Sequence, residues 1–211
     1  MTAQTAVKII RALRKEYPGA TTSLAYNNPI NLLVATILSA QCTDKMVNKV
    51  TPRLFQKYKS ARDYADADIR TLMGEIRSIG LYKGKARNIK KMARKISKDF
   101  AGKVPRSIDE LVLLPGVGRK TANIVLSNAF GIDQGIAVDT HVRRLSKKIG
   151  LTNKDIPDKI EQDLIKIVPT RYWGTVNRLL VSHGRAVCRA VNPAHDACCI
   201  RRFCRWYKEN V

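Results

Sequence analysis

The stretch from Leu113 to His141, LLPGVGRKTANIVLSNAFGIDQGIAVDTH, decides what we expect of this chain. It begins with a glycine-rich turn, Pro115-Gly116-Val117-Gly118, that opens directly into a helical pattern at Arg119 and Lys120. It ends at Val138-Asp139-Thr140-His141, where a further helical pattern starts. The rest of the sequence is best understood as positioning these two ends or surrounding them with positive charge.

The glycine-rich turn has the composition of an anion site. Glycines allow a tight turn and leave backbone N–H groups uncovered, and the positive end of the following helix adds to their pull on a phosphate. Gly116, Gly118 and Arg119 are therefore candidate contacts to a nucleic-acid phosphate, which would position a duplex without reading its sequence. The alternative is an ordinary glycine-broken connection between two helices.

Lys120 and Asp139 are the candidate catalytic pair. The helix N-terminus and neighbouring cations favour the neutral amine of Lys120, which could attack an electrophilic carbon and form a Schiff base. The alternative is a phosphate-binding lysine. Asp139 precedes a helix as a candidate N-cap, which would keep its carboxylate ionised and fixed. Such a carboxylate can stabilise oxocarbenium charge or assist proton transfer, and plain capping is compatible with either role.

The overall charge points to a polyanionic partner. The 211 residues include 39 Lys and Arg against 17 Asp and Glu, a net charge of +22. DNA or RNA is the first candidate, because neutralising phosphates releases counterions, and an anionic membrane surface is the second. The longest apolar run, residues 30–40, is shorter than the roughly 18 residues that a membrane span needs. The N-terminus lacks the pattern of a signal peptide, so we expect a cytoplasmic protein.

Hydrophobic periodicity indicates an all-α protein. Apolar residues recur at helical spacing, with capping residues and proline or glycine between the segments. Only residues 135–138 read as extended. The helices expected from these patterns cover residues 3–16, 29–40, 44–54, 67–79, 83–98, 107–114, 119–129, 139–149, 156–167 and 172–183.

The segment 83–98 is unusually basic, with eight Lys or Arg and no acidic residue. An apolar stripe runs through it, so we expect one helix with a core face and a basic face. That basic face is either simply solvated or attracts phosphate, and the sequence leaves both readings open.

Four of the five cysteines lie within residues 188–204. In a reducing compartment such a cluster is more often a metal site than a disulfide framework. The fifth, Cys42, reads as a small buried hydrophobe.

LPGVGRKTAN followed by AVDTHVRRL resembles the endonuclease III family of DNA glycosylases, whose motif is a helix–hairpin–helix, a Gly/Pro-rich stretch and an aspartate. The resemblance continues through LLVATILSAQCTDKMVNK, IRSIGLYKGKARNI and VSHGRAVC. It implies an all-α fold of two helical lobes. Residues 22–133 would form a six-helix-type lobe with the hairpin, and residues 1–21 with 134–211 a second lobe, with the active site in the cleft between them.

The resemblance also implies roles for individual residues. Lys120 matches the nucleophile and Asp139 the essential aspartate. Gln41 and Leu81 match residues that fill the stack vacated by an extruded base, although the sequence alone would make Gln41 a helix end and Leu81 a core residue. His141 matches a position near the DNA backbone, although alone it would be only a first-turn residue of a helix. Arg144 is a further expected DNA contact.

The implied function is a bifunctional glycosylase and abasic-site lyase of base excision repair that removes oxidised pyrimidines. Its partner would be duplex DNA with damaged bases or abasic sites. We expect a monomer that is associated with the nucleoid and does not bind a membrane. The alternatives are a monofunctional mismatch glycosylase acting on uracil or thymine and a non-catalytic helix–hairpin–helix DNA-binding protein.

The family usually carries a [4Fe-4S] cluster on Cys-x6-Cys-x2-Cys-x5-Cys, and this chain departs from that pattern once. Cys188, Cys198 and Cys204 match, but His195 stands at the second position. His195 could ligate iron as imidazole does in some clusters, or Cys199 could replace it. A third reading is a zinc site, or no metal. The cluster's implied role is to organise an arginine-rich loop.

Overall fold

The computed structural model describes residues 1–211 and contains only helices, turns and loops. The predicted all-α class is confirmed, since no β-strand forms anywhere in the chain. The chain divides into two compact units, residues 22–132 and residues 1–21 with 133–211, which we describe separately. No helix has both the length and the apolar composition to cross a bilayer.

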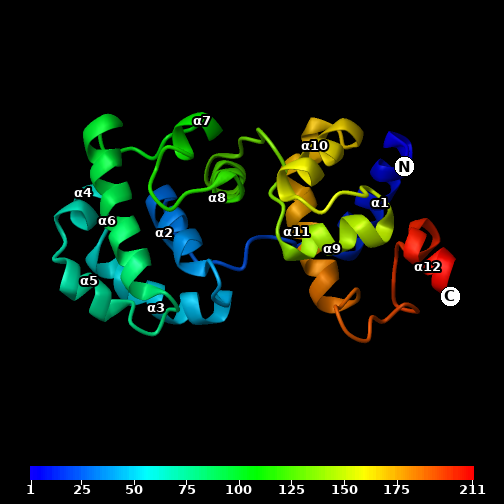
Figure 1. Cartoon of the computed structure of the whole chain (residues 1–211), viewed down its shortest axis with the longest axis horizontal. Helices are drawn as coiled ribbons and strands as arrows, with labels where there is room; N and C mark the ends of the chain where they lie inside the picture. The colour runs from blue at the N-terminus through cyan, green and yellow to red at the C-terminus, as the bar shows by residue number, and fades with distance from the viewer. The chain divides into compact units, whose positions relative to one another are not determined.

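The unit of residues 22–132 is built on a helix that is buried on every side. All side chains from Ile30 to Leu38 of this helix, α2, are buried, and it packs against α3, α6 and α8 (Figure 1). Asn28 caps α2 by accepting a hydrogen bond from the Asn31 N–H at 2.9 Å. The helices of this unit are α2 (Pro29–Ser39), α3 (Asp44–Lys57), α4 (Ala61–Asp66), α5 (Ile69–Glu75), α6 (Tyr82–Asp99), α7 (Ile108–Leu111), α8 (Arg119–Val125) and the π-helical turn η1 (Leu126–Phe130).

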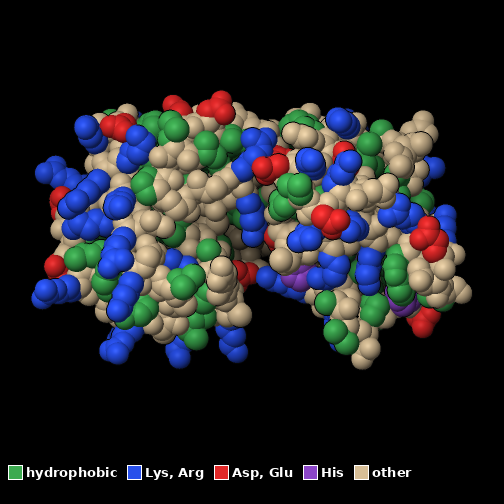
Figure 2. Space-filling view, viewed as in Figure 1, with side chains coloured by type: hydrophobic (Ala, Val, Ile, Leu, Met, Phe, Trp, Pro, Cys, Tyr) green, Lys and Arg blue, Asp and Glu red, His purple; other side chains and the backbone are tan.

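Helix α6 carries the basic segment, and two of its lysines are structural. Its apolar stripe, from Ile89 to Ile96, enters the core, as its spacing predicts. However, the Lys85 amine donates to two backbone carbonyls of another segment, and the Lys90 amine donates to the Ala67 carbonyl at the end of α4. The other cations of the segment remain at the surface, where Lys and Arg greatly outnumber acidic side chains (Figure 2).

The second unit brings the two ends of the chain together. Helix α1 packs against α10 and α11, while α9 packs against α10, α11 and α12 (Figure 1). Its core comprises apolar residues from α1, α9, α10 and α11, together with the extended segment before α9. The helices of this unit are α1 (Ala3–Glu16), α9 (Thr140–Ile149), α10 (Pro157–Ile167), η2 (Thr170–Tyr172), α11 (Trp173–Ala186), η3 (Arg201–Phe203) and α12 (Arg205–Asn210).

Helix boundaries differ from the sequence expectation at several places. The helix expected over 67–79 spans only Ile69–Glu75, because the chain turns there towards Gly80 and Leu81. The helix expected over 119–129 ends at Val125 and widens into a π-helical turn, closed by Gly131 with φ +66°. Periodicity missed α4, whose N-terminus is fixed by a reciprocal capping box between Ser60 and Asp63. An aspartate at the third position makes that box hard to recognise in sequence.

Candidate functional site

The glycine-rich turn joins α7 to α8 and leaves the start of α8 uncovered. Gly116 has φ +82°, and a Cβ built on it would stand 3.0 Å from the Asn88 Cβ of α6, so glycine is required there. Gly118 is the N-cap of α8 with ordinary extended angles, and a Cβ on it would meet nothing within 4 Å. Val117 between them is buried and anchors the turn. The geometry suits the approach of an anion to the first N–H groups of α8.

Lys120 is the second residue of α8 and is exposed. Three side chains of the same helix, Ala122, Asn123 and Val125, are buried, and α8 packs against α2. Lys120 therefore lies on a helix packed into the core, directly after the glycine-rich turn, with its side chain exposed.

Asp139 is the N-cap of α9, as its position in the sequence predicts. Its Oδ1 accepts a hydrogen bond from the Val142 N–H at 2.8 Å. Its φ of −106° and ψ of −172° are extended, and its side chain is half-buried. The carboxylate is thus fixed at the positive end of a helix.

The extended segment before Asp139 forms no strand, because side chains take the place of a partner strand. The buried carboxylate of Glu161 accepts a hydrogen bond from the Ile136 N–H at 3.1 Å. The Asn177 amide donates to the Ala137 carbonyl at 2.9 Å. Sequence reasoning missed both residues, which lie on α10 and α11 and hold the backbone that carries Asp139.

His141 and Arg144 lie on the first two turns of α9, close to α11. One guanidinium nitrogen of Arg144 donates to the Gly184 carbonyl at 3.2 Å and to the Cys188 carbonyl at 2.8 Å. Glycine at position 184 leaves room for both side chains, since a Cβ there would stand 2.7 Å from the His141 Nδ1 and 3.1 Å from the Arg144 guanidinium nitrogen. Arg144 therefore connects α9 to the end of α11 and the first cysteine of the loop. The resemblance implied only a DNA contact for Arg144.

Gln41 and Leu81 share an unusual backbone conformation. Their φ angles are +53° and +58°, the left-handed region that such residues rarely adopt. Both side chains are exposed, Leu81 at 67%. A Cβ on Gly80 would stand 3.8 Å from the Gln41 carbonyl oxygen, so the two turns lie side by side. Strain of this kind concentrates at binding sites.

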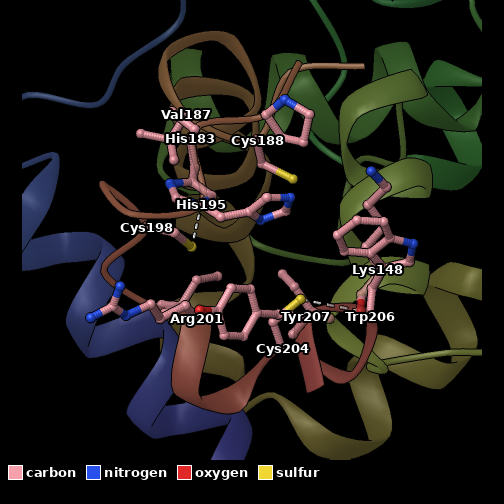
Figure 3. Close-up of a pocket in the computed structure, with 14 residues that line it drawn as sticks. Lys148, His183, Val187, Cys188, His195, Cys198, Arg201, Cys204, Trp206 and Tyr207 are labelled. Carbon is pink, nitrogen blue, oxygen red and sulfur yellow. Dashed lines mark hydrogen bonds between the residues drawn. The ribbon is translucent and has the colours of Figure 1, made fainter. Parts of the chain in front are cut away.

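The side chains of Cys188, His195, Cys198 and Cys204 line one pocket between α9, α11 and α12 (Figure 3). Burial raises the pKa of the Cys188 and Cys198 thiols, so thiolates here need a cationic partner such as a metal. No three His, Cys, Asp or Glu side chains of the chain gather around a point that could hold a single metal ion. Three thiols and one imidazole, which are metal-ligand types, therefore line one pocket without converging on a single point.

His195 and Cys199 are placed differently with respect to this pocket. The His195 ring stacks on Trp206, with centroids 5.0 Å apart and planes at 13°, and it lines the pocket. Cys199 is not among the lining residues. Burial, followed by the charges of Cys198 and of Glu16 on α1, raises the pKa of the Cys199 thiol to about 11. Cys199 therefore lies on the α1 side of the loop.

His183 is a further buried group that lines this pocket, near the end of α11. Its Nδ1 is hydrogen-bonded to the Tyr17 hydroxyl at 2.9 Å, and its Nε2 lies 3.4 Å from the Cys198 sulfur (Figure 3). Burial lowers the pKa of His183 to about 4, so the ring is neutral at neutral pH. It links α1 to the cysteine-rich loop.

The chain is similar in sequence to known proteins over nearly its whole length. Residues 34–170 match the family model described as HhH-GPD superfamily base excision DNA repair protein. The chain is 50% identical to an endonuclease III of Synechocystis over 201 residues, covering 95% of this chain and 92% of that protein. It is 48% identical to an endonuclease III of Bacillus subtilis over 190 residues, covering 90% and 86%.

Solved structures give the same likeness. One is an endonuclease III trapped as a covalent intermediate with DNA, and another is a non-covalent endonuclease III–DNA complex. Each superposes with a TM-score of 0.92 at 44% identity, covering 99% of this chain and 98% of the other.

Proposed function

Because this chain belongs to the endonuclease III family of base-excision repair proteins, we propose that Lys120 and Asp139 carry its chemistry on one nucleotide of damaged DNA. The protein is a DNA N-glycosylase and abasic-site lyase that removes oxidised pyrimidines. The observation that carries the residue assignment is the exposed Lys120 on the first turn of α8, directly after an uncovered glycine-rich turn.

Binding begins at the glycine-rich turn. The N–H groups at the start of α8 take a backbone phosphate, and Arg119 adds positive charge. The exposed Gln41 and Leu81 enter the base stack as the damaged nucleotide is extruded, as wedge residues do at DNA kinks. His141 faces the DNA backbone from the first turn of α9.

The chemistry then proceeds on the extruded sugar. The Lys120 amine attacks C1′, the bond from C1′ to the base breaks, and the base leaves with a proton. Asp139 stabilises the positive charge that develops on the sugar and accepts the proton lost by the amine. The C1′–O4′ bond then breaks, O4′ takes up that proton, and the opened sugar is left joined to Lys120 as an iminium. The iminium makes a C2′ proton acidic. Its removal expels the 3′ oxygen, which cleaves the strand by β-elimination.

A substrate panel tests this function. We expect base release and strand cleavage on duplexes with thymine glycol or dihydrouracil, and cleavage alone at a plain abasic site. Base release from mismatched uracil without strand cleavage would instead identify a monofunctional mismatch glycosylase. Binding of all duplexes without any product would identify a DNA-binding protein.

Substitution of the two glycines of the turn should have different effects, one on stability and one on DNA binding. Gly116→Ala should destabilise the fold by about 1–2 kcal/mol. Left-handed backbone is unfavourable for alanine, and its Cβ would crowd Asn88. Gly118→Ala should leave stability unchanged but weaken binding to abasic duplex about tenfold, because its methyl group occupies the space that a phosphate needs. Urea unfolding and binding at fixed salt measure the two effects. Unchanged binding by Gly118→Ala would show that no phosphate binds at this turn.

We further propose that Cys188, His195, Cys198 and Cys204 hold a [4Fe-4S] cluster. In this proposal His195, and not Cys199, is the ligand that accompanies the three cysteines. All four side chains line the same pocket, whereas Cys199 lies towards α1. When bound, the cluster cross-links the loop and supplies no step of the base-removal reaction. The chain's own residues, including Arg144 at the Cys188 carbonyl, connect that loop to α9.

Iron content and visible absorbance of anaerobically prepared protein test the ligand set. Cys188→Ser and His195→Ala should lose iron, whereas Cys199→Ser should retain it. His195→Cys should retain the cluster and lower its reduction potential, since imidazole ligation raises the potential relative to thiolate. Loss of iron from Cys199→Ser, with iron retained in His195→Ala, would show that Cys199 and not His195 is the fourth ligand. Zinc without iron in the wild type would refute the cluster.

The finer partner and location assignments follow from the same function. We propose that the protein acts as a monomer on duplex DNA in the cytoplasm, associated with the nucleoid. Its net charge of +22 supports association with a polyanion. 

A further inference from the structure

A buried lysine joins the two strained turns that carry Gln41 and Leu81. Lys85, on the first turn of α6, is only 6% exposed. Its amine donates to the Leu38 carbonyl at 2.8 Å and to the Ala40 carbonyl at 2.6 Å. These carbonyls belong to the last turn and C-cap of α2, where backbone acceptors lack helical partners and the helix end is negative.

The same residue also contacts the second turn. The Lys85 N–H donates to the Leu81 carbonyl at 3.1 Å. Lys85 therefore holds the peptide just before Gln41 through its side chain, and the ordinary first-turn hydrogen bond of α6 places it next to Leu81.

The arrangement has an energetic cost that a simple helix end would not require. Burial lowers the pKa of Lys85, because the ammonium is removed from water. A helix C-terminus can be closed by a glycine or by solvent without any buried charge. Left-handed backbone at non-glycine residues persists only where surrounding contacts determine it. The buried ammonium supplies such contacts on the Gln41 side.

We propose that Lys85 is a positioning residue that holds Gln41 and Leu81 as one preformed wedge for a duplex with an extruded base. This inference rests on the proposed function. Its specific consequence is that Lys85 matters for opening a paired duplex and not for the Schiff-base chemistry of Lys120.

The test compares two substrates with one variant. Lys85→Met keeps the length of the side chain and removes the ammonium. On duplex DNA with a paired thymine glycol, we expect kcat/KM to fall at least tenfold. On a single-stranded abasic oligonucleotide, which has no paired stack to fill, borohydride trapping should stay within twofold of wild type. Fluorescence of 2-aminopurine opposite the lesion should rise less than with wild type.

Lys90→Met is the matched control. Lys90 lies on the same helix and also donates to a carbonyl at a helix end, that of Ala67 after α4. It should change stability without changing the ratio of duplex to single-strand activity. Lys85→Arg, which keeps charge and donors, should recover part of the duplex activity even if the methionine variant folds poorly.

The outcomes separate this inference from the proposed function. Lys85→Met could lose activity equally on duplex and single-stranded substrates, or could show the same ratio of duplex to single-strand activity as Lys90→Met. Either result would mean that Lys85 only stabilises the fold. Failure of the arginine variant to recover any duplex activity would also count against the proposal. Absence of a trapped adduct from wild-type protein on abasic duplex DNA would overturn the proposed function itself.

Discussion

Replacing Lys120 with glutamine should abolish the covalent adduct that borohydride traps on abasic-site DNA and reduce strand cleavage roughly a thousandfold or more. The amide has nearly the length of the amine but cannot form an imine. Lys120 is exposed on α8, so the substitution should not change the free energy of unfolding. Gel analysis of trapped protein–DNA adducts and of cleaved strands measures the effect.

Lys103→Gln is the control for charge. Lys103 is an exposed lysine of the same unit, in the loop between α6 and α7, and its replacement removes the same charge. It should trap and cleave as wild type does. If Lys120→Gln still forms the adduct at the wild-type level, another amine is the nucleophile and Lys120 binds phosphate.

Replacing Asp139 with asparagine should reduce base removal roughly a hundredfold to a thousandfold and leave the fold intact. Asparagine caps helices about as well as aspartate, so the hydrogen bond from the Val142 N–H can be kept. What disappears is the negative charge beside the sugar. Single-turnover kinetics of thymine glycol release, together with urea unfolding, separate the catalytic effect from the structural one.

Asp68→Asn tests whether capping alone could explain such a loss. Asp68 is the N-cap of α5 and accepts a hydrogen bond from the Thr71 N–H at 2.8 Å, the same length as the Asp139 contact. Its substitution should leave the rate of base removal unchanged. Wild-type rates in Asp139→Asn would mean that Asp139 only caps α9.

Local signals in the sequence were sufficient for most of the helices and for the helix positions of the two candidate catalytic residues. The helical repeat predicted α1, α6 and α9, and Asp139 occupies the N-cap that its position indicated. Each of these depends on residues within about one helical turn, where capping and side-chain spacing act. The misplaced end of α8, where Leu126–Phe130 forms a π-helical turn, shows the limit of that reasoning.

The basic segment 83–98 shows why surface function is harder to read. Eight cations with no acid predicted one basic face, solvated or attracting phosphate. In the structure Lys85 and Lys90 instead hold carbonyls at the ends of α2 and α4. Charge counts cannot distinguish a solvated lysine from one that closes a distant helix, because the partner is separated by tens of residues.

The sequence by itself determined the helical class, the glycine-rich turn before Lys120, the capping aspartate and the spacing of the cysteines. All of these are properties of neighbouring residues. The tertiary structure decided that Arg144 contacts the Cys188 carbonyl, that Glu161 and Asn177 hold the segment before Asp139, and that His195 shares the pocket of the cysteines while Cys199 lies towards α1. These contacts join segments far apart in the chain, and packing of the helices alone determines which of them meet.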